Sequence, residues 1–172
     1  RLMFTICNLQ GQVIGFGGRI LSKINQPKYL NSPETIIFNK SKNLYGLNWS
    51  KRSIRRSNEA IIVEGYTDVI TAHQFGIENV VASLGTSLTS QQAKLLRRYA
   101  DKIYIAYDSD SAGEKATLRG LKILKNEGLE VKVIELPVEQ DPDDFIKKYG
   151  KEKFLELKQE SSSLIKFRLN SI

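Results

Sequence analysis

The feature that most constrains the fold is a regular alternation of short apolar runs and helical stretches that begins near residue 59. Three apolar runs, at residues 60–63, 79–83 and 102–107, are each followed by a segment with helical spacing, and a fourth lies at 130–136. Strands that are apolar on both sides are typical of a parallel sheet covered by helices on both faces. The sequence therefore predicts an α/β fold with a mainly parallel sheet.

Capping signals mark the ends of the predicted helices. Thr89 and Gln92 have the spacing of a capping box at the start of the segment 89–100. Gly76 and Gly128 follow the helical segments 67–75 and 112–126, where glycine favours a helix end. The segments 141–150 and 151–169 also have helical spacing, so we expect helices and no further strand after the fourth one.

The first third of the chain predicts strands and loops. Apolar runs at 2–8 and 12–18 lie on either side of a glycine-centred turn signal and predict a hairpin. Residues 21–35 contain two prolines and predict a loop. Residues 42–57 have helical spacing and end in a basic cluster, which is either a solvated helix end or a DNA contact: Lys51, Arg52, Arg55 and Arg56.

Composition and charge limit the class of protein. Of the 172 residues 41% are apolar, as in a globular domain, and no stretch approaches the roughly 18 apolar residues of a membrane span. The net charge of +7 favours a polyanionic partner. The single cysteine, Cys7, excludes an internal disulfide framework and predicts a reducing, cytoplasmic compartment. Because the chain starts at Arg1 without a secretory leader, we expect part of a longer protein that is not secreted.

Acidic side chains follow three of the predicted strands. Glu64 comes directly after 60–63, Asp108 and Asp110 follow 102–107, and Asp141 and Asp143 lie beyond 130–136. The carboxyl ends of parallel neighbours meet at one edge of a sheet, so we expect these carboxylates to converge. Crowded carboxylates repel one another, and a divalent cation with oxygen ligands relieves that repulsion. The pattern predicts a Mg²⁺ or Mn²⁺ site at this edge.

Several of these acids also have a purely structural interpretation. Ser111 has the spacing of a capping-box residue, and in that case Asp110 serves only the dipole of the helix that follows. Asp141 and Asp143 flank a proline, which is an ordinary start for a helix. The conjunction of acids at three strand ends is what favours a shared cation site.

Four motifs in this order resemble the Toprim domain and, more narrowly, the bacterial DnaG-type DNA primases. They are EGYTDVI at 64–70, ASLGTSLT at 82–89, YDSDSAGEKA at 107–116 and DPDDFI at 141–146. Upstream, VIGFGGRIL and PKYLNSPETIIFNKSKNLYGL are similar to the amino-terminal part of the primase polymerase core. The resemblance implies part of a small basic α+β subdomain at 1–57, a Toprim domain at 58–140, and a metal-site loop with the start of a helical subdomain at 141–172.

The resemblance also implies roles for individual residues. Many primases have glycine where this chain has Ser109, but the Toprim motif requires only the two aspartates on either side of it. GFGGR is expected to be a loop that presents an arginine to nucleic acid. The implied catalytic and metal-binding residues are Glu64, Asp108 and Asp110, with Asp141 and Asp143 completing the metal site; Asp68 supports them, and Arg19, Lys28, Asn31 and Lys40 contact nucleotide phosphates or template.

The function that the resemblance implies is synthesis of short RNA primers on single-stranded DNA by metal-dependent nucleotidyl transfer. Two or more Mg²⁺ or Mn²⁺ ions are expected, with zinc only in a module outside this chain. The implied partners are a single-stranded DNA template, nucleoside triphosphates and the RNA primer. The replicative helicase and single-strand-binding protein would be reached through the full-length protein at the cytoplasmic replication fork, without a membrane.

Three other functions remain as alternatives. A haloacid-dehalogenase-like phosphatase also ends a strand with two aspartates, but it usually has threonine or valine where this chain has Ala112. A non-catalytic Toprim module would bind DNA or protein without chemistry. A Toprim nuclease or topoisomerase shares the acids, and the topoisomerase would need a nucleophilic tyrosine from another domain.

Overall fold

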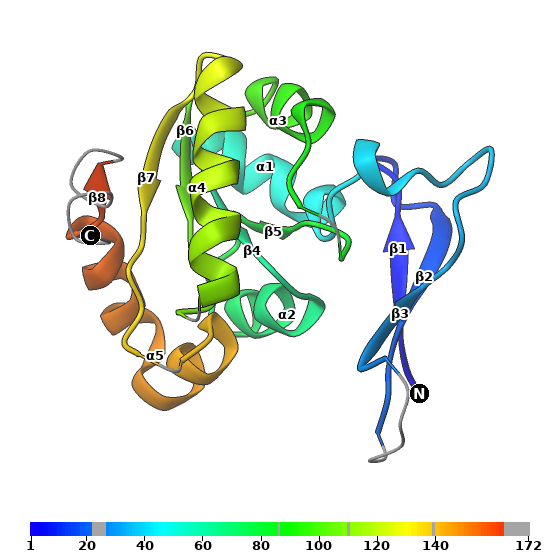
Figure 1. Cartoon of the computed structure of the whole chain (residues 1–172), viewed down its shortest axis with the longest axis horizontal. Helices are drawn as coiled ribbons and strands as arrows, with labels where there is room; N and C mark the ends of the chain where they lie inside the picture. The colour runs from blue at the N-terminus through cyan, green and yellow to red at the C-terminus, as the bar shows by residue number, and fades with distance from the viewer. Residues whose placement is uncertain (22–26, 86, 110, 139, 164–172) are drawn as a thin grey trace.

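The described residues of the chain form two sheets joined by helices and loops (Figure 1). The structure is a computed structural model, and it describes residues 1–21, 27–85, 87–109, 111–138 and 140–163. The first sheet has the order β1-β2-β3 and is antiparallel, with β1 at Leu2–Cys7, β2 at Val13–Arg19 and β3 at Tyr29–Asn31. The predicted hairpin is confirmed.

The second sheet has the order β5-β4-β6-β7-β8, and its first four strands are parallel. These strands are β4 at Glu59–Val63, β5 at Val80–Ala82, β6 at Lys102–Ile105 and β7 at Glu130–Val133. The helical elements are η1 at Lys40–Lys42, α1 at Leu47–Ser57, α2 at Tyr66–Gln74, α3 at Ser90–Arg97, α4 at Ser111–Asn126 and α5 at Pro142–Gln159. The predicted α/β fold with a mainly parallel sheet is confirmed.

Successive residues of β4 enter two different hydrophobic cores, which explains why this strand is apolar throughout. Ile61 and Val63 lie in the core formed with α2 and α5, where Val69 and Phe154 are also buried. Ala60 and Ile62 lie in the core formed with α1, α3 and α4. A strand buried on both sides has no polar face. The sheet is therefore covered on both faces, as its composition predicted.

The helix ends follow the predicted capping signals. Thr89 and Gln92 form a reciprocal capping box, with N···O distances of 3.0 and 3.1 Å between each backbone N–H and the partner side chain. Gly76 and Gly128 have positive φ angles of 77° and 78°, a backbone conformation that glycine adopts without strain. These short-range signals decide where α3 begins and where α2 and α4 end.

Three local predictions are wrong. The loop predicted at 21–35 contains β3, a strand of three residues whose pairing with β2 sets its conformation. GFGGR is not a loop, since β2 runs through it and ends at Arg19. The helices predicted after the fourth strand are followed by a further strand, β8 at Ser162–Ser163, antiparallel to β7.

The longest helix, α5, contains a break at Gly150, where φ is 82° and ψ is 177°. The break falls at the boundary between the two helical segments predicted at 141–150 and 151–169. The part of the second segment beyond residue 163 lies outside the described residues. No helix in the described ranges is long and apolar enough to cross a membrane.

Tyr66 joins the two sheets. Its ring stacks on Phe4 of β1 with a centroid separation of 4.9 Å, and Tyr45 meets it edge-on at 4.6 Å. Its hydroxyl donates a hydrogen bond of 2.6 Å to the side-chain oxygen of Asn31 in β3. The close approach requires glycine at position 17, because a Cβ there would lie 2.5 Å from the Tyr66 ring. The first sheet is therefore held against α2, at the start of the EGYTDVI motif.

Gly17→Ala is expected to lower the melting temperature, because the added methyl group overlaps the ring of Tyr66. Overpacking of this kind costs about 1–3 kcal/mol, and each kcal/mol lowers the melting temperature by about 2–4 °C in a chain of this size. Gly18→Ala is the matched control, because its Cβ would face the flexible side chains of Arg1 and Met3 at 3.2 Å. Thermal unfolding followed by circular dichroism makes the comparison. Equal melting temperatures for Gly17→Ala and the wild type would contradict the packing role of Gly17.

Candidate metal and nucleotide site

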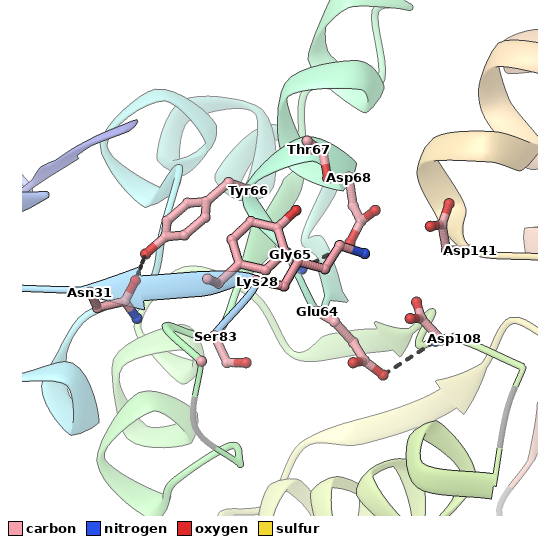
Figure 2. Close-up of a pocket in the computed structure, with 12 residues that line it drawn as sticks. Lys28, Asn31, Glu64, Gly65, Tyr66, Thr67, Asp68, Ser83, Asp108 and Asp141 are labelled. Atoms are coloured by element: carbon pink, nitrogen blue, oxygen red, sulfur yellow. Dashed lines mark hydrogen bonds between the residues drawn. The ribbon is translucent and has the colours of Figure 1, made fainter. Parts of the chain in front are cut away.

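A cavity of about 250 Å³ lies at the carboxyl ends of β4 and β6, between the parallel sheet and β3. Figure 2 shows acidic side chains on one side of this cavity and the long side chain of Lys28 extending over it. The described residues that line it are Lys28, Tyr29, Asn31, Glu64, Gly65, Tyr66, Thr67, Asp68, Ser83, Gly85, Asp108 and Asp141. The structure thus gathers residues from four predicted motifs at one place.

Glu64 and Asp108 are brought together by the pairing of β4 with β6. Glu64 directly follows the last residue of β4, and Asp108 comes three positions after the last residue of the neighbouring strand. The backbone N–H of Asp108 donates a hydrogen bond of 3.3 Å to Oε1 of Glu64 (Figure 2). The predicted convergence of these two acids is therefore present. Asp110, the third predicted acid of the set, lies outside the described residues.

Gly113 in the first turn of α4 allows the helix to approach these acids. A Cβ on Gly113 would lie 2.1 Å from the carbonyl oxygen of Asp108 and 3.2 Å from Oε1 of Glu64. Residue 113 therefore has to be glycine if α4 is to begin where it does. The sequence analysis missed this role, although the glycine stands inside the YDSDSAGEKA motif and a glycine in a first helical turn is a recognisable signal.

Asp68 occupies the first turn of α2, and its carboxylate faces the same cavity (Figure 2). It accepts a hydrogen bond of 2.8 Å from the backbone N–H of Gly65, and only 5% of its surface is exposed. Burial and, to a smaller extent, the charges of Asp141, Asp108 and Asp143 raise the pKa of Asp68 to about 7, against the lowering effect of the Gly65 N–H. A carboxyl that is buried beside other carboxylates suits a cation, which would favour the ionised form.

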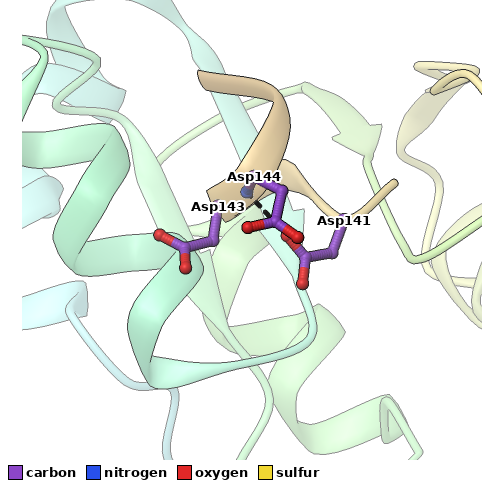
Figure 3. Close-up of side chains that lie close together, drawn as sticks. All are labelled: Asp141, Asp143 and Asp144. Atoms are coloured by element: carbon purple, nitrogen blue, oxygen red, sulfur yellow. Dashed lines mark hydrogen bonds between the residues drawn. The ribbon is translucent and has the colours of Figure 1, made fainter. Parts of the chain in front are cut away.

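Asp141, Asp143 and Asp144 lie together at the start of α5, with one carboxylate oxygen of each within 4.8 Å of the others (Figure 3). Asp141 caps the helix, since its Oδ1 accepts a hydrogen bond of 2.7 Å from the backbone N–H of Asp144. Asp141 therefore starts the helix, as the structural interpretation expected. Asp141 also lines the cavity, so the cap leaves it next to the other acids.

Asp143 points away from the cavity, towards α2 (Figure 3). It is 8% exposed, accepts a short hydrogen bond from the hydroxyl of Thr71, and pairs with Lys147 at 2.7 Å. The Thr71 contact fastens the start of α5 to the middle of α2, whereas the pair with Lys147 lies within α5. The structure thus places Asp143 near the predicted metal site but not among the residues that line it.

The predicted nucleotide-binding residues are not all at the cavity. Lys28 and Asn31 line it, but the Asn31 amide already donates 2.8 Å to the carbonyl of Leu84 and accepts from a tyrosine hydroxyl. Arg19 ends β2 with its guanidinium 5.7 Å from the Tyr29 ring centroid. Lys40 lies in η1, away from the residues that line the cavity. Lys28 is therefore the predicted cation that the structure brings into the cavity.

Ser109 connects two loops at this edge of the sheet. Its hydroxyl donates 2.9 Å to the carbonyl of Pro137 and accepts 3.1 Å from the backbone N–H of Gln140. These contacts join the loop after β6 to the loop that leads into α5. Ser109 therefore ties together the loops that carry Asp108 and Asp141.

Comparisons with known proteins identify the family of this chain. A family model described as Toprim-like matches residues 61–146, and one described as the DNA primase catalytic core, N-terminal domain, matches residues 1–51. The chain is 54% identical to the DNA primase of Clostridium acetobutylicum over 170 residues. This match covers 99% of this chain and 28% of that protein. The Aquifex aeolicus primase structure, with zinc binding and RNA polymerase domains, has a TM-score of 0.91 at 44% identity, covering 96% of this chain and 41% of that one. A DnaG primase catalytic domain bound to single-stranded DNA has a TM-score of 0.89 at 41% identity, covering 98% and 54%.

The Toprim-like match spans half of the chain, so the chain belongs to the Toprim-like family. Along nearly its whole length it groups with the bacterial DnaG-type primases. It spans about 28% of the length of the first curated relatives that it matches.

Gly113→Ala is expected to weaken Mn²⁺ binding by at least about tenfold, the usual effect of disturbing residues that orient metal ligands. The added Cβ collides with the backbone of Asp108, so that loop has to move. Gly120→Ala, in the same helix, is the matched control, because its Cβ would meet only side-chain ends, those of Ile105 at 3.3 Å and Leu88 at 3.8 Å. Isothermal titration with MnCl₂ provides the measurement. Equal affinities for the two variants would contradict the orienting role of Gly113.

Asp68→Asn is expected to stabilise the metal-free chain at pH 8 by at least about 2 °C in melting temperature. The pKa of Asp68 is raised from 3.8 to about 7 in the folded chain, so ionisation of this group opposes folding as the pH rises through that interval. Asparagine keeps the oxygen that accepts from Gly65 and removes the charge. The difference between the two proteins should shrink as the pH is lowered from 8 to 4, measured by thermal unfolding in EDTA. A pH-independent difference would exclude Asp68 as its source.

Proposed function

We propose that this chain is part of the RNA-polymerase core of a bacterial primase, which makes short RNA primers on single-stranded DNA by nucleotidyl transfer. The observation that carries the proposal is the convergence of Glu64, Asp68, Asp108 and Asp141 on one cavity, with Lys28 reaching over it. The match of nearly the whole chain to DNA primases supports the same function.

The acidic residues would hold the divalent cations. Glu64, Asp108 and Asp141 are proposed as ligands of Mg²⁺ or Mn²⁺, since carboxylate oxygens are the ligands that these ions prefer. We assign the same role to Asp110, which belongs to the same motif. Bound there, the cations would favour ionisation of the primer 3′-hydroxyl and neutralise charge on the triphosphate. Asp68 is buried and hydrogen-bonded at the start of a helix, and we assign it a supporting role beside the ligands and not direct binding of the cations.

Asp143 is proposed to act through position. Its hydrogen bond with Thr71 fixes the start of α5 against α2, so that Asp141 faces the cavity, and Lys147 of the same helix neutralises its charge. A buried carboxylate with two donors is already satisfied and stabilises its surroundings. We therefore assign Asp143 to support of the metal site.

Basic residues on the first sheet would bind phosphates. Lys28, which directly precedes β3, extends its side chain over the cavity, opposite the carboxylates (Figure 2). Its ammonium group is placed to contact a triphosphate whose other side faces the cations. Arg19, at the end of β2, and Lys40, in η1, lie outside the cavity lining and are proposed to contact template phosphates further along the strand.

The proposed partners follow from this chemistry. They are single-stranded DNA, nucleoside triphosphates and the growing RNA primer, and a related catalytic domain has been solved with single-stranded DNA. Contacts with a helicase or a single-strand-binding protein are assigned to the rest of the full-length protein in the cytoplasm. A nuclease or topoisomerase is disfavoured, because residues 1–51 match the amino-terminal domain of the primase core. We find no observation that favours a non-catalytic module.

Template-dependent primer synthesis by the full-length parent protein tests the proposal. Glu64→Gln is expected to lower the rate by at least about 100-fold, because several kcal/mol of charge stabilisation depend on the cations. Glu156→Gln, the same change at an exposed acid of α5 that pairs with Lys153, is the matched control and should keep normal activity. A Glu64→Gln protein that retains wild-type primer synthesis would refute the proposed role.

A further inference from the structure

A second groove lies between α1, α2 and the second half of α5. It consists of two adjoining cavities of about 360 and 180 Å³, which share Ser53, Arg56 and Glu78 as lining residues. Trp49 lines the first cavity and Lys151 the second, so the groove extends from an aromatic side chain to a cationic one.

This groove is separate from the acidic cavity. Glu78 and Asn79 immediately precede β5, so they stand at the amino edge of the parallel sheet, whereas Glu64 and Asp108 follow the carboxyl ends of their strands. None of the described residues that line the acidic cavity lines either part of the groove. A ligand in the groove would therefore leave the metal site accessible.

Trp49 is an exposed aromatic ring held in a fixed position. Its side chain is 46% exposed, although Tyr45 and His73 contact it edge-on with centroid distances of 5.6 and 5.9 Å. Burial lowers the pKa of His73, so its ring is neutral at physiological pH. A ring that is supported on one side and open on the other offers a surface for stacking with little loss of side-chain entropy.

The groove is cationic. Arg52 and Arg56 follow Trp49 at positions i+3 and i+7 of α1, so all three share one face of the helix. The side chain of Arg52 makes no hydrogen bond or ion pair with the part of the chain that the structure describes. Glu78 is the acid in the lining, and it is already engaged by Ser53 at 2.8 Å and Arg56 at 3.6 Å. Together with Lys151 the groove carries three cations against one paired carboxylate.

We propose that this groove binds a single-stranded polynucleotide outside the metal site, with one base stacked on Trp49 and the adjacent phosphates against Arg52, Arg56 and Lys151. An aromatic platform beside a row of cations is the combination that binds single strands without sequence preference. The site would hold a stretch of strand away from the catalytic edge. Its binding requires no divalent cation and no contact with Glu64 or Asp108.

An acidic peptide is the main competing occupant, and the walls of the larger cavity disfavour it, although Ile77 and Leu155 line the smaller one. The larger cavity is lined, among the described residues, by Trp49, His73, arginines, a serine and Glu78, without an aliphatic side chain. Apolar anchors of a peptide would need aliphatic or aromatic walls on several sides. A flat base needs one ring face and polar groups at its edge, which this cavity provides.

Trp49 is the single tryptophan of the chain, so its fluorescence reports on this groove directly. Titration of the chain with an oligothymidylate in EDTA should quench this fluorescence, with a Kd that increases with salt concentration. Arg52→Ala should raise the Kd from the fluorescence titration by at least about fivefold. Arg98→Ala, the same loss of charge at the exposed end of α3, is the matched control and should change it less than twofold.

A second measurement covers Trp49 itself. Fluorescence anisotropy of a labelled oligothymidylate should show weaker binding to Trp49→Phe than to the wild type and still weaker binding to Trp49→Ala. Circular dichroism checks that each variant is folded. This order distinguishes stacking on an aromatic ring from a general effect of charge.

The proposal would be overturned by unchanged Trp49 fluorescence at saturating oligothymidylate, or by equal effects of Arg52→Ala and Arg98→Ala. Stronger quenching by poly-glutamate than by oligothymidylate would also overturn it and would assign the groove to an acidic protein segment. Because the titrations contain no divalent cation, their failure leaves the proposed primase function untouched. Loss of primer synthesis in Glu64→Gln tests that function separately.

Discussion

The parallel pairing of β4 with β6 is the constraint on which the rest of the site depends. It places Glu64 and Asp108 side by side, and the N–H of Asp108 bonds to the Glu64 carboxylate. Both strands are buried on two faces, so a slip by one residue would exchange the side chains that enter the two cores and disrupt the packing of both. Packing of the hydrophobic cores, and not contacts between the acids, therefore determines where the acids lie.

The same arrangement has an electrostatic cost. Asp68 is buried next to other carboxylates, and its pKa of about 7 expresses how unfavourable its charge is there. The chain offsets this with backbone N–H donors, with the cap at Asp141 and with the pairing of Asp143 to Lys147. Residues that oppose folding in this way are expected where a site is organised for a ligand.

The sequence predicted those parts of the structure that depend on local patterns. Continuous apolar runs indicated the parallel sheet, and the Thr89 box and Gly76 marked the helix ends, because these signals act within a few residues. β3 and β8 escaped prediction because their conformation depends on partners that are distant in the sequence. For the same reason the engagement of Asp143 with Thr71, and the backbone of Asp108 that a Cβ at position 113 would meet, could be identified only in three dimensions.

Tyr66 couples the two sheets mechanically. It belongs to the motif that supplies Glu64, yet its ring and hydroxyl contact the sheet that carries Lys28. A shift of that sheet would therefore displace the first turn of α2 as well. The two sides of the cavity are coupled through Tyr66. Under the proposed function, a disturbed joint would misalign a nucleotide bound between Lys28 and Glu64 without removing its contacts. Such damage would therefore lower the rate of turnover more than the affinity for the nucleotide.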